Sequence, residues 1–287
     1  MVIPEHLLKC VMFLGRSEES GPPRLMGTAF LVGRPAGPGR LFGYLVTARH
    51  VVHNIRKRAS AVLVRFNMKD GEATWAPIPV EDWLEHPTDP SVDVAVAPVA
   101  IPEELDHLVV PISLFVDAAK IAEHGIGLGD EVVVTGLFVH HHGRLRNSPV
   151  VRVGNIAALP TEPVDSKIGP IEAYLVEARS IGGLSGSPTF VHLGIARFMG
   201  GKVRFAENAP VYFLLGLMHG HWDVEVPDAD DASEDADAAP SAKRVNMGIA
   251  MVVPAHRIAE TLAHPAIQAR EAEALAHGAT EEPPAQA

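Results

Sequence analysis

A glycine-rich turn around Ser185 constrains the fold of this chain more than any other stretch. Residues 181–190 are Ile-Gly-Gly-Leu-Ser-Gly-Ser-Pro-Thr-Phe, so the serine lies between glycines and a proline follows. Proline stops a helix or inner strand from running through, and glycine adopts backbone angles that other residues resist. Such a turn can expose one hydroxyl and aim neighbouring N–H groups at one point. Acyl-transfer chemistry needs that arrangement of a nucleophile beside an oxyanion hole.

Ser185 is the candidate nucleophile of this turn, and the N–H groups of Gly183 and Ser185 are the candidate oxyanion hole. Ser187 is the rival nucleophile. Because Gly/Ser-rich turns are common, the stretch alone is also consistent with an ordinary surface turn. The assignment therefore depends on a base and an acid elsewhere in the chain.

The composition favours many short strands joined by turns. Of 287 residues, 47% are hydrophobic, and the counts of 25 glycines and 24 prolines are high. No apolar run is as long as a membrane span, and the N-terminus lacks a signal-peptide pattern. Cys10 is the only cysteine, so no intrachain disulfide can form. We expect a cytoplasmic bacterial protein without membrane contact, although a secreted protein after signal removal would look the same.

Negative charge is concentrated in one segment. The net charge is −11, but acidic residues gather between Asp223 and Asp237, where no basic residue occurs. The rest of the chain is close to neutral, which gives little support to nucleic-acid binding, and the basic run at residues 56–58 is interpreted as a solvated loop. Residues 223–243 contain few apolar side chains, so we expect a flexible loop there.

A base and an acid stand beside two predicted strands. His50 follows an apolar strand over residues 41–47, and Asp93 is the second residue of a strand over 92–99. A serine nucleophile needs a histidine base, and the base needs an acid to orient it. Along the chain the histidine comes first, the aspartate second and Ser185 last, which is the order found in chymotrypsin.

Three local contexts resemble the trypsin/chymotrypsin-like serine peptidases. Leu-Val-Thr-Ala-Arg-His-Val-Val around His50 is similar to the family's Leu-Thr-Ala-Ala-His segment. Asp-Val-Ala-Val from Asp93 is similar to its Asp-Ile-Ala-Leu, and Gly-Leu-Ser-Gly-Ser-Pro around Ser185 to its Gly-Asp/Asn-Ser-Gly-Gly/Ser-Pro. Within the family, the chain resembles the disulfide-poor bacterial branch of glutamyl endopeptidases and HtrA-type peptidase domains, over roughly residues 8–265.

The resemblance implies an all-β fold of two antiparallel six-stranded β-barrels with a short C-terminal helix. The expected domains are a first barrel over 1–110 with His50 and Asp93, a second over 111–265 with Ser185, and a flexible helical or disordered tail over 266–287. The implied function is a serine endopeptidase that cuts peptide or protein substrates through an acyl-enzyme. No metal or organic cofactor is expected.

The resemblance also places a specificity pocket beside the serine turn. Arg179 lies six residues before Ser185, at the base of this pocket, where a cation favours an acidic residue before the cut. The alternative is that the arginine points out of the pocket and pairs elsewhere. The substrate-binding candidates are Arg179, Ser180, Met218, His219 and His221.

Three features depart from the family pattern or compete with it. Leu184 replaces the aspartate that pairs with a new N-terminal amine in trypsin-type zymogens, so that switch is absent. Arg49 replaces a small residue beside His50, and we expect its side chain to extend to solvent. Three consecutive histidines at residues 140–142 suggest a metal site, but their loop also holds glycine and two arginines, and we predict none.

Two other functions stay open. One is a protease-fold binding or regulatory protein whose site is latent, and the other is an esterase-like hydrolase without a peptide substrate. The sequence indicates neither the physiological substrate nor the oligomeric state.

Overall fold

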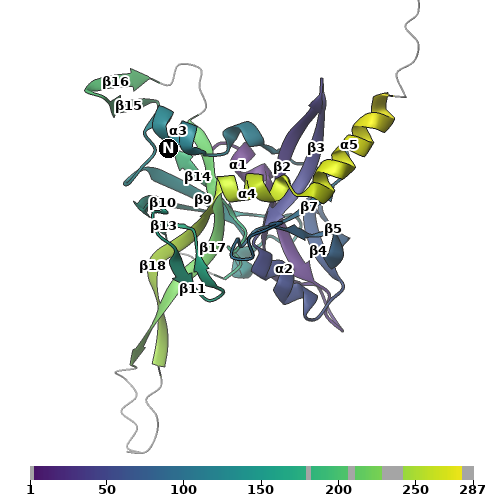
Figure 1. Ribbon diagram of the computed structural model, residues 1–287. Helices are drawn as coiled ribbons and strands as arrows, with labels where there is room; N and C mark the ends of the chain where they lie inside the picture. Colours follow the sequence, from purple (N-terminus) through teal and green to yellow (C-terminus); the bar gives the residue numbers. More distant parts are fainter. Residues whose placement is uncertain (1–2, 179–181, 206–210, 228–241, 280–287) are drawn as a thin grey trace, which may run out of the picture.

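The computed structural model describes residues 3–178, 182–205, 211–227 and 242–279, which form two β-sheet bodies side by side (Figure 1). The predicted all-β, chymotrypsin-like fold is confirmed. The two bodies pack against each other, because the hydrophobic core of the first half also contains Phe190, Leu217 and Val253 from the second half. Because these apolar contacts cross the boundary, the halves support each other rather than folding as separate cores.

The first half is an open sheet of eight strands, in the order β5-β4-β1-β2-β3-β7-β6, with β8 added in parallel to β2. The ladders along this order are antiparallel, and none of those in the described part of the chain joins β5 to β6. This half is therefore a half-barrel rather than a closed barrel. Its strands are β1 (Val11–Arg16), β2 (Arg24–Gly37), β3 (Arg40–Thr47), β4 (Ala61–Asn67), β5 (Ala73–Pro79), β6 (Leu84–Glu85), β7 (Ala95–Val99) and β8 (Val110–Pro111).

The second half is a closed six-stranded barrel in the order β10-β13-β18-β17-β14-β9. Valine-rich strands fill its interior, with Val132, Val134 and Val252 fully buried. The barrel strands are β9 (Glu131–Gly136), β10 (Val150–Ala158), β13 (Tyr174–Glu177), β14 (Pro188–His192), β17 (Tyr212–Pro227) and β18 (Ala242–Pro254). Two small hairpins lie outside both sheets: β11 (Val164–Ser166) with β12 (Gly169–Ile171), and β15 (Ala196–Met199) with β16 (Lys202–Phe205).

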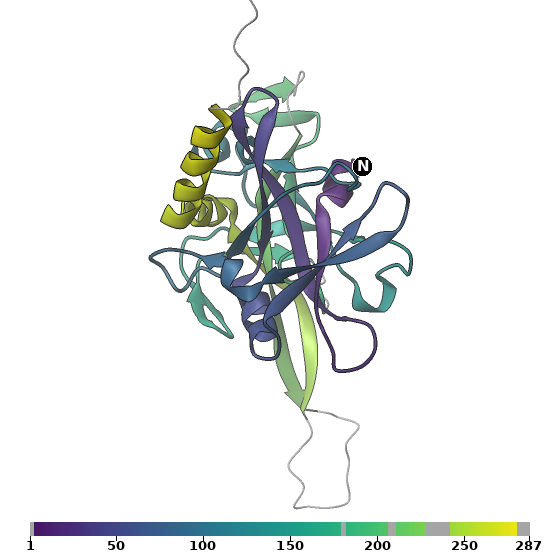
Figure 2. The same ribbon diagram turned by 90° about the vertical axis from the view of Figure 1, so that its right-hand side faces the viewer.

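Strands β17 and β18 continue as a two-stranded ribbon that extends away from the barrel (Figure 2). Their pairing reaches Pro227 and Ala242, so the acidic segment predicted as a loop over 223–243 begins and ends in strand. Residues 228–241 of that prediction lie outside the described residues.

The helices are short except at the C-terminal end. They are α1 (His6–Lys9), α2 (Arg49–Arg56), α3 (Ala118–His124), α4 (Ala255–Leu262) and α5 (Pro265–Ala279), with single 3₁₀ turns η1 (Val80–Asp82), η2 (Ile112–Leu114) and η3 (Val139–His141). None of the helices in the described ranges combines the length and the apolar character that crossing a membrane requires.

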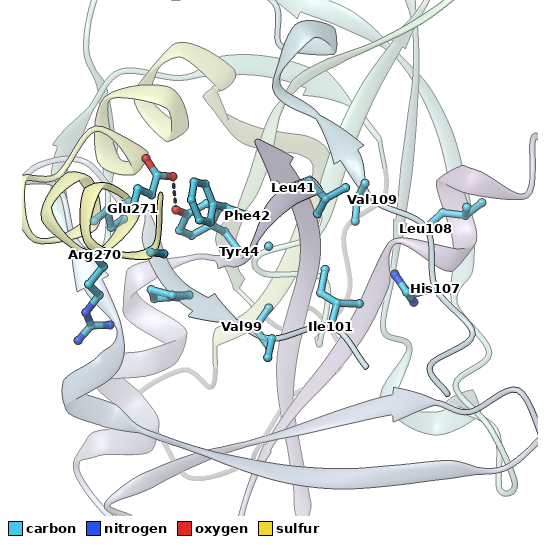
Figure 3. A pocket seen from close by; sticks show the side chains of 15 residues that line it. Leu41, Phe42, Tyr44, Val99, Ile101, His107, Leu108, Val109, Arg270 and Glu271 are labelled. Carbon is cyan, nitrogen blue, oxygen red and sulfur yellow. Dashed lines mark hydrogen bonds between the residues drawn. The ribbon is translucent and has the colours of Figure 1, made fainter. Parts of the chain in front are cut away.

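Helix α5 returns to the first half and is fixed there by polar contacts (Figure 3). The Glu271 carboxylate accepts hydrogen bonds from the Tyr44 hydroxyl and from Arg34, the latter at 2.7 Å, and Ile267 is fully buried. A partly buried ion pair and a buried isoleucine therefore anchor this helix to the first half. Residues 280–287 lie outside the described residues. The cavity of about 680 Å³ beside α5 is lined by none of the predicted site residues.

Cys10 lies fully buried in the core of the first half. Its Sγ is 3.7 Å from the Leu7 carbonyl oxygen. Burial raises the pKa of this thiol to about 12, so it stays protonated at neutral pH.

Candidate active site

His50 is positioned by the junction of strand β3 and helix α2. Ala48 is still extended (φ −72°, ψ 131°), and the helix begins at Arg49. The opposite face of α2 buries Val51, Val52 and Ile55 in the core, which fixes the helix start. The His50 side chain is 24% exposed, so the imidazole is held at the surface of the sheet rather than inside it.

Asp93 binds His50 twice. Its fully buried carboxylate accepts the His50 backbone N–H through Oδ1 (2.9 Å) and lies 2.7 Å from His50 Nδ1 through Oδ2. Because a carboxylate can only accept, the proton of the imidazole lies on Nδ1, and Nε2 keeps a free lone pair. The sequence predicted this pair, and the structure brings the two residues together.

A second imidazole lies on the same carboxylate. His219 Nδ1 is 2.5 Å from Asp93 Oδ2, and the two histidine rings are 5.1 Å apart at 69°. The sequence assigned His219 to the wall of a substrate pocket, whereas its imidazole is almost completely buried against Asp93. No local motif indicates this contact, because β17 and Asp93 are far apart in the chain.

Asp93 is ionised at neutral pH. Burial alone would raise the pKa of this carboxyl, but hydrogen bonds from His219 and His50 outweigh it and hold the pKa well below its usual range. The site therefore contains a buried negative charge that accepts three N–H groups, two from His50 and one from His219.

His50, Asp93 and His219 also form the only cluster of potential metal ligands in the described part of the chain. Their ligand atoms lie within 4.8 Å of one another. The contacts of 2.5 and 2.7 Å are hydrogen-bond lengths, in which each nitrogen keeps its proton. A metal would need the lone pairs of those nitrogens, so the geometry favours a hydrogen-bond network. The histidines at 140–142 form no such cluster with the described residues.

The turn that carries Ser185 requires glycine and is tied to the first half. Gly183 and Gly186 have φ of +103° and +85°. A Cβ on Gly186 would lie 2.1 Å from the Thr28 carbonyl oxygen, so no other residue fits. Thr28 on β2 holds the turn by donating its N–H to the Ser185 carbonyl (2.9 Å) and its hydroxyl to the Gly183 carbonyl (2.8 Å).

The Ser185 hydroxyl donates to the backbone carbonyl of His219 at 3.0 Å. Among the described residues no hydrogen bond joins Ser185 to His50. His50 and Asp93 are therefore hydrogen-bonded to each other, while the Ser185 hydroxyl is bound to the His219 carbonyl.

The rival serine is inaccessible. Ser187 is fully buried, and its Oγ has no hydrogen-bond partner in the described part of the chain. It fills the space above Gly136, where a Cβ would lie 1.9 Å from that Oγ. A substrate cannot reach this hydroxyl, which favours Ser185 over Ser187.

The remaining predicted residues have different surroundings. Arg179 and Ser180 lie outside the described residues. The side chain of Met218 is buried in the barrel core, so only its backbone can border a pocket, and it bonds Gly186 and Ser187. His221 is half-buried on β17 opposite Ala250.

The expectation that Arg49 extends to solvent is wrong. Its side chain is only 15% exposed, and its Nη1 lies 4.0 Å from Glu85 on β6. The same carboxylate is 2.6 Å from His53 Nε2. Arg49 and His53 thus both face the Glu85 carboxylate, and the Arg49 guanidinium lies against the protein rather than in solvent.

No protein-family model matches the chain, and a comparison with curated proteins gives no match either. Among solved structures, the chain is similar to the MamO protease domain from Magnetospirillum magneticum in its apo form. That similarity has a TM-score of 0.50 and 15% identity, and covers 88% of this chain and 96% of that one. The chain is also similar to the inactive form of an Rv3671c mutant from M. tuberculosis H37Rv, with a TM-score of 0.44 and 21% identity. That similarity covers 91% of this chain and 87% of that one. The similarity to HBP has a TM-score of 0.45 and 10% identity, and covers 99% of this chain and 97% of that one. The open sheet, the closed barrel and the first of these similarities establish that this chain has the chymotrypsin-like serine peptidase fold.

Proposed function

We propose that this chain is a serine endopeptidase in which Ser185 is the nucleophile, His50 the base and Asp93 the orienting acid. The observation that supports this most is the double hydrogen bond of His50 to the buried Asp93 carboxylate. It fixes the tautomer in which Nε2 can accept a proton, beside a glycine turn that presents a half-buried serine.

The reaction begins when the Ser185 hydroxyl turns from the His219 carbonyl to His50 Nε2. Its oxygen then attacks the peptide carbonyl while the proton passes to the imidazole. The imidazolium next gives this proton to the leaving amine, which leaves an acyl-enzyme on Ser185. Water repeats the sequence and releases the acid. The N–H groups of Gly183 and Ser185 are the proposed donors to the oxyanion, each worth about 3 kcal/mol.

His219 acts in this scheme as a positioning residue. Its Nδ1–H fixes the Asp93 oxygen that also faces His50, and its own carbonyl receives the resting Ser185 hydroxyl. One residue of β17 thus contacts both the acid and the nucleophile, which links the second barrel to the acid–base pair.

The substrate preference that we propose follows from Arg179. By the resemblance to the family it lies at the pocket base, and a desolvated cation there favours Glu or Asp before the cut, by about 2–4 kcal/mol. Arg179→Ala should reduce kcat/KM for acidic peptides far more than for neutral ones. A preference for basic residues that this variant does not change would contradict the assignment.

A latent binding or regulatory protein is the second candidate. The hydrogen bond from Ser185 to the His219 carbonyl favours it, because the hydroxyl is not directed at its base. In that case a partner or substrate would have to turn the serine before any chemistry.

The deciding experiment incubates a proteome-derived peptide library with the wild type, Ser185→Ala and Ser187→Ala. We expect cleavage by the wild type with an intact N-terminus, because Leu184 cannot take part in zymogen activation, and by Ser187→Ala. We expect none by Ser185→Ala. Fluorophosphonate labelling of Ser185 without peptide cleavage would indicate an esterase or a latent site, and activity that persists in Ser185→Ala would disprove the assignment.

A further inference from the structure

The hairpin of β15 and β16 stands apart from both sheets (Figure 1). Its two faces differ chemically. Residues directly opposite each other in an antiparallel pair lie on the same face. Phe198 pairs with Val203, and Phe205 with Ala196, so these four share one face. The other face holds two more cross-strand pairs, which are Arg197 with Arg204 and Met199 with Lys202.

The β15 side of the basic face rests on the body of the protein, whereas Lys202 and Arg204 on β16 are exposed. Arg197 donates to the Asp130 carboxylate (2.7 Å) and to the Gly125 carbonyl (2.8 Å). Met199 packs on Gly125, where a Cβ would lie 2.9 Å from the methionine methyl group. The apolar face must therefore point away from the body.

That apolar face is open to solvent. Phe198 is 76% exposed, Phe205 66% and Val203 57%, and the preceding Ile195 is 76% exposed. An isolated two-stranded hairpin is marginally stable in water, so a partner that covers this apolar face would stabilise the hairpin.

The positive charge of the hairpin favours an anionic partner. Residues 194–205 contain three cations and no acidic residue, in a chain of net charge −11. Neither Lys202 nor Arg204 has an ion-pair partner among the described residues, while Arg197 is bound to Asp130. The hairpin thus combines exposed aromatic groups with two unpaired cations.

A second copy of the chain fits this surface poorly. Two strands of four residues present an area of about 130 Å², whereas a stable interface needs about 800 Å² on each partner. Two facing hairpins would also bring cations together without a carboxylate on either hairpin to pair them.

We propose that the β15–β16 hairpin binds the surface of a membrane that contains anionic phospholipids. Phe198, Val203 and Phe205 insert at the boundary of headgroups and acyl chains, a depth of about 5–10 Å. The long side chains of Lys202 and Arg204 then reach the lipid phosphates. This proposal departs from the expectation of no membrane contact, which considered only segments long enough to span, and it does not depend on peptidase activity.

The test is flotation of the full chain with vesicles of phosphatidylcholine alone or mixed equally with phosphatidylglycerol. We expect the wild type to float with the anionic vesicles at low salt and to be released at high salt. The double variant Phe198→Ser/Phe205→Ser should lose binding by roughly tenfold or more. Lys202→Gln and Arg204→Gln should each weaken it about fivefold.

Matched controls are Leu145→Ser and Val153→Ser, which remove apolar side chains exposed to 73% and 50% elsewhere on the surface. They should float like the wild type, and thermal melting should show that every variant is folded. As an independent measure, Phe198→Trp should be quenched by lipids brominated on the acyl chain.

Three outcomes would overturn the proposal. They are failure of the wild type to float with anionic vesicles, equal flotation of the Phe198/Phe205 variant, and no quenching of Phe198→Trp. A concentration-dependent dimer that this double variant abolishes, without vesicle binding, would show that a second copy covers the face.

Discussion

The two halves of the molecule contribute to the site in different ways. The first half holds both His50, at the start of α2, and Asp93, just before β7, and a backbone and a side-chain hydrogen bond join them directly. The second half supplies Ser185 on a turn whose position depends on Thr28 from the first half and whose hydroxyl contacts His219. The His50–Asp93 pair thus lies within the first half, whereas the orientation of the Ser185 hydroxyl depends on contacts at the interface between the halves.

The largest effect should come from the pair inside the first half. Asp93→Asn retains the shape but favours the wrong tautomer of His50, so kcat should fall by about 10⁴-fold. Steady-state kinetics on the preferred peptide measures this. A loss of less than tenfold would mean that the observed pair does not orient the base during the reaction.

Much of the first half was predictable from the sequence, and the reason lies in local pattern. The strand before His50 and the short apolar run after Asp93 are both local signals, and the structure brings these residues together. The glycines around Ser185 indicated the turn, because Gly183 and Gly186 need positive φ. The interface was not predictable in this way. Two contacts join segments that are far apart in the chain: His219 with Asp93, and α5 with Tyr44 and Arg34. The hydrophobic periodicity of a sequence gives no information about such contacts.

The next effect tests the link that β17 makes between the halves. His219→Ala removes one donor to the charged Asp93, which should cost about 1.5–3 kcal/mol and lower kcat/KM about 10- to 100-fold. His219→Asn can place an amide N–H near the position of Nδ1 and should recover most of that loss. The downfield proton resonance of the His50 Nδ1–H should shift in the alanine variant and return in the asparagine variant. Equal activity of all three proteins would restrict His219 to a packing role.

A smaller effect concerns the anchor of the serine turn. Thr28→Val removes the hydroxyl that binds both the Gly183 carbonyl and the Leu137 N–H. The free energy of unfolding should therefore fall by about 1–3 kcal/mol. Urea denaturation measures this loss. Thr189→Val is the matched control, because its buried hydroxyl has no partner in the described part of the chain, and stability should stay equal or rise. If both variants lost the same stability, the anchor would be no different from any buried threonine.

The smallest effect is the acid dependence of stability. The folded-state pKa of Asp93 lies below its unfolded value of about 3.9, so its contribution is complete above that pH and is lost as pH falls toward the folded-state pKa. Wild-type stability should therefore decline more steeply than that of Asp93→Asn below about pH 4. Urea midpoints along an acid series measure the two slopes, and parallel slopes would contradict the assignment of a buried charge.

The single cysteine has a practical consequence for studying motion between the halves. Because Cys10 is fully buried and remains a thiol at neutral pH, it should be nearly inert to maleimide reagents. The natural chain is thus a background for site-directed spectroscopic labelling that needs no prior cysteine removal. Two introduced surface cysteines, one in each sheet, would carry a spin-label or fluorophore pair, and the distance between them could be followed while a substrate turns Ser185 toward His50.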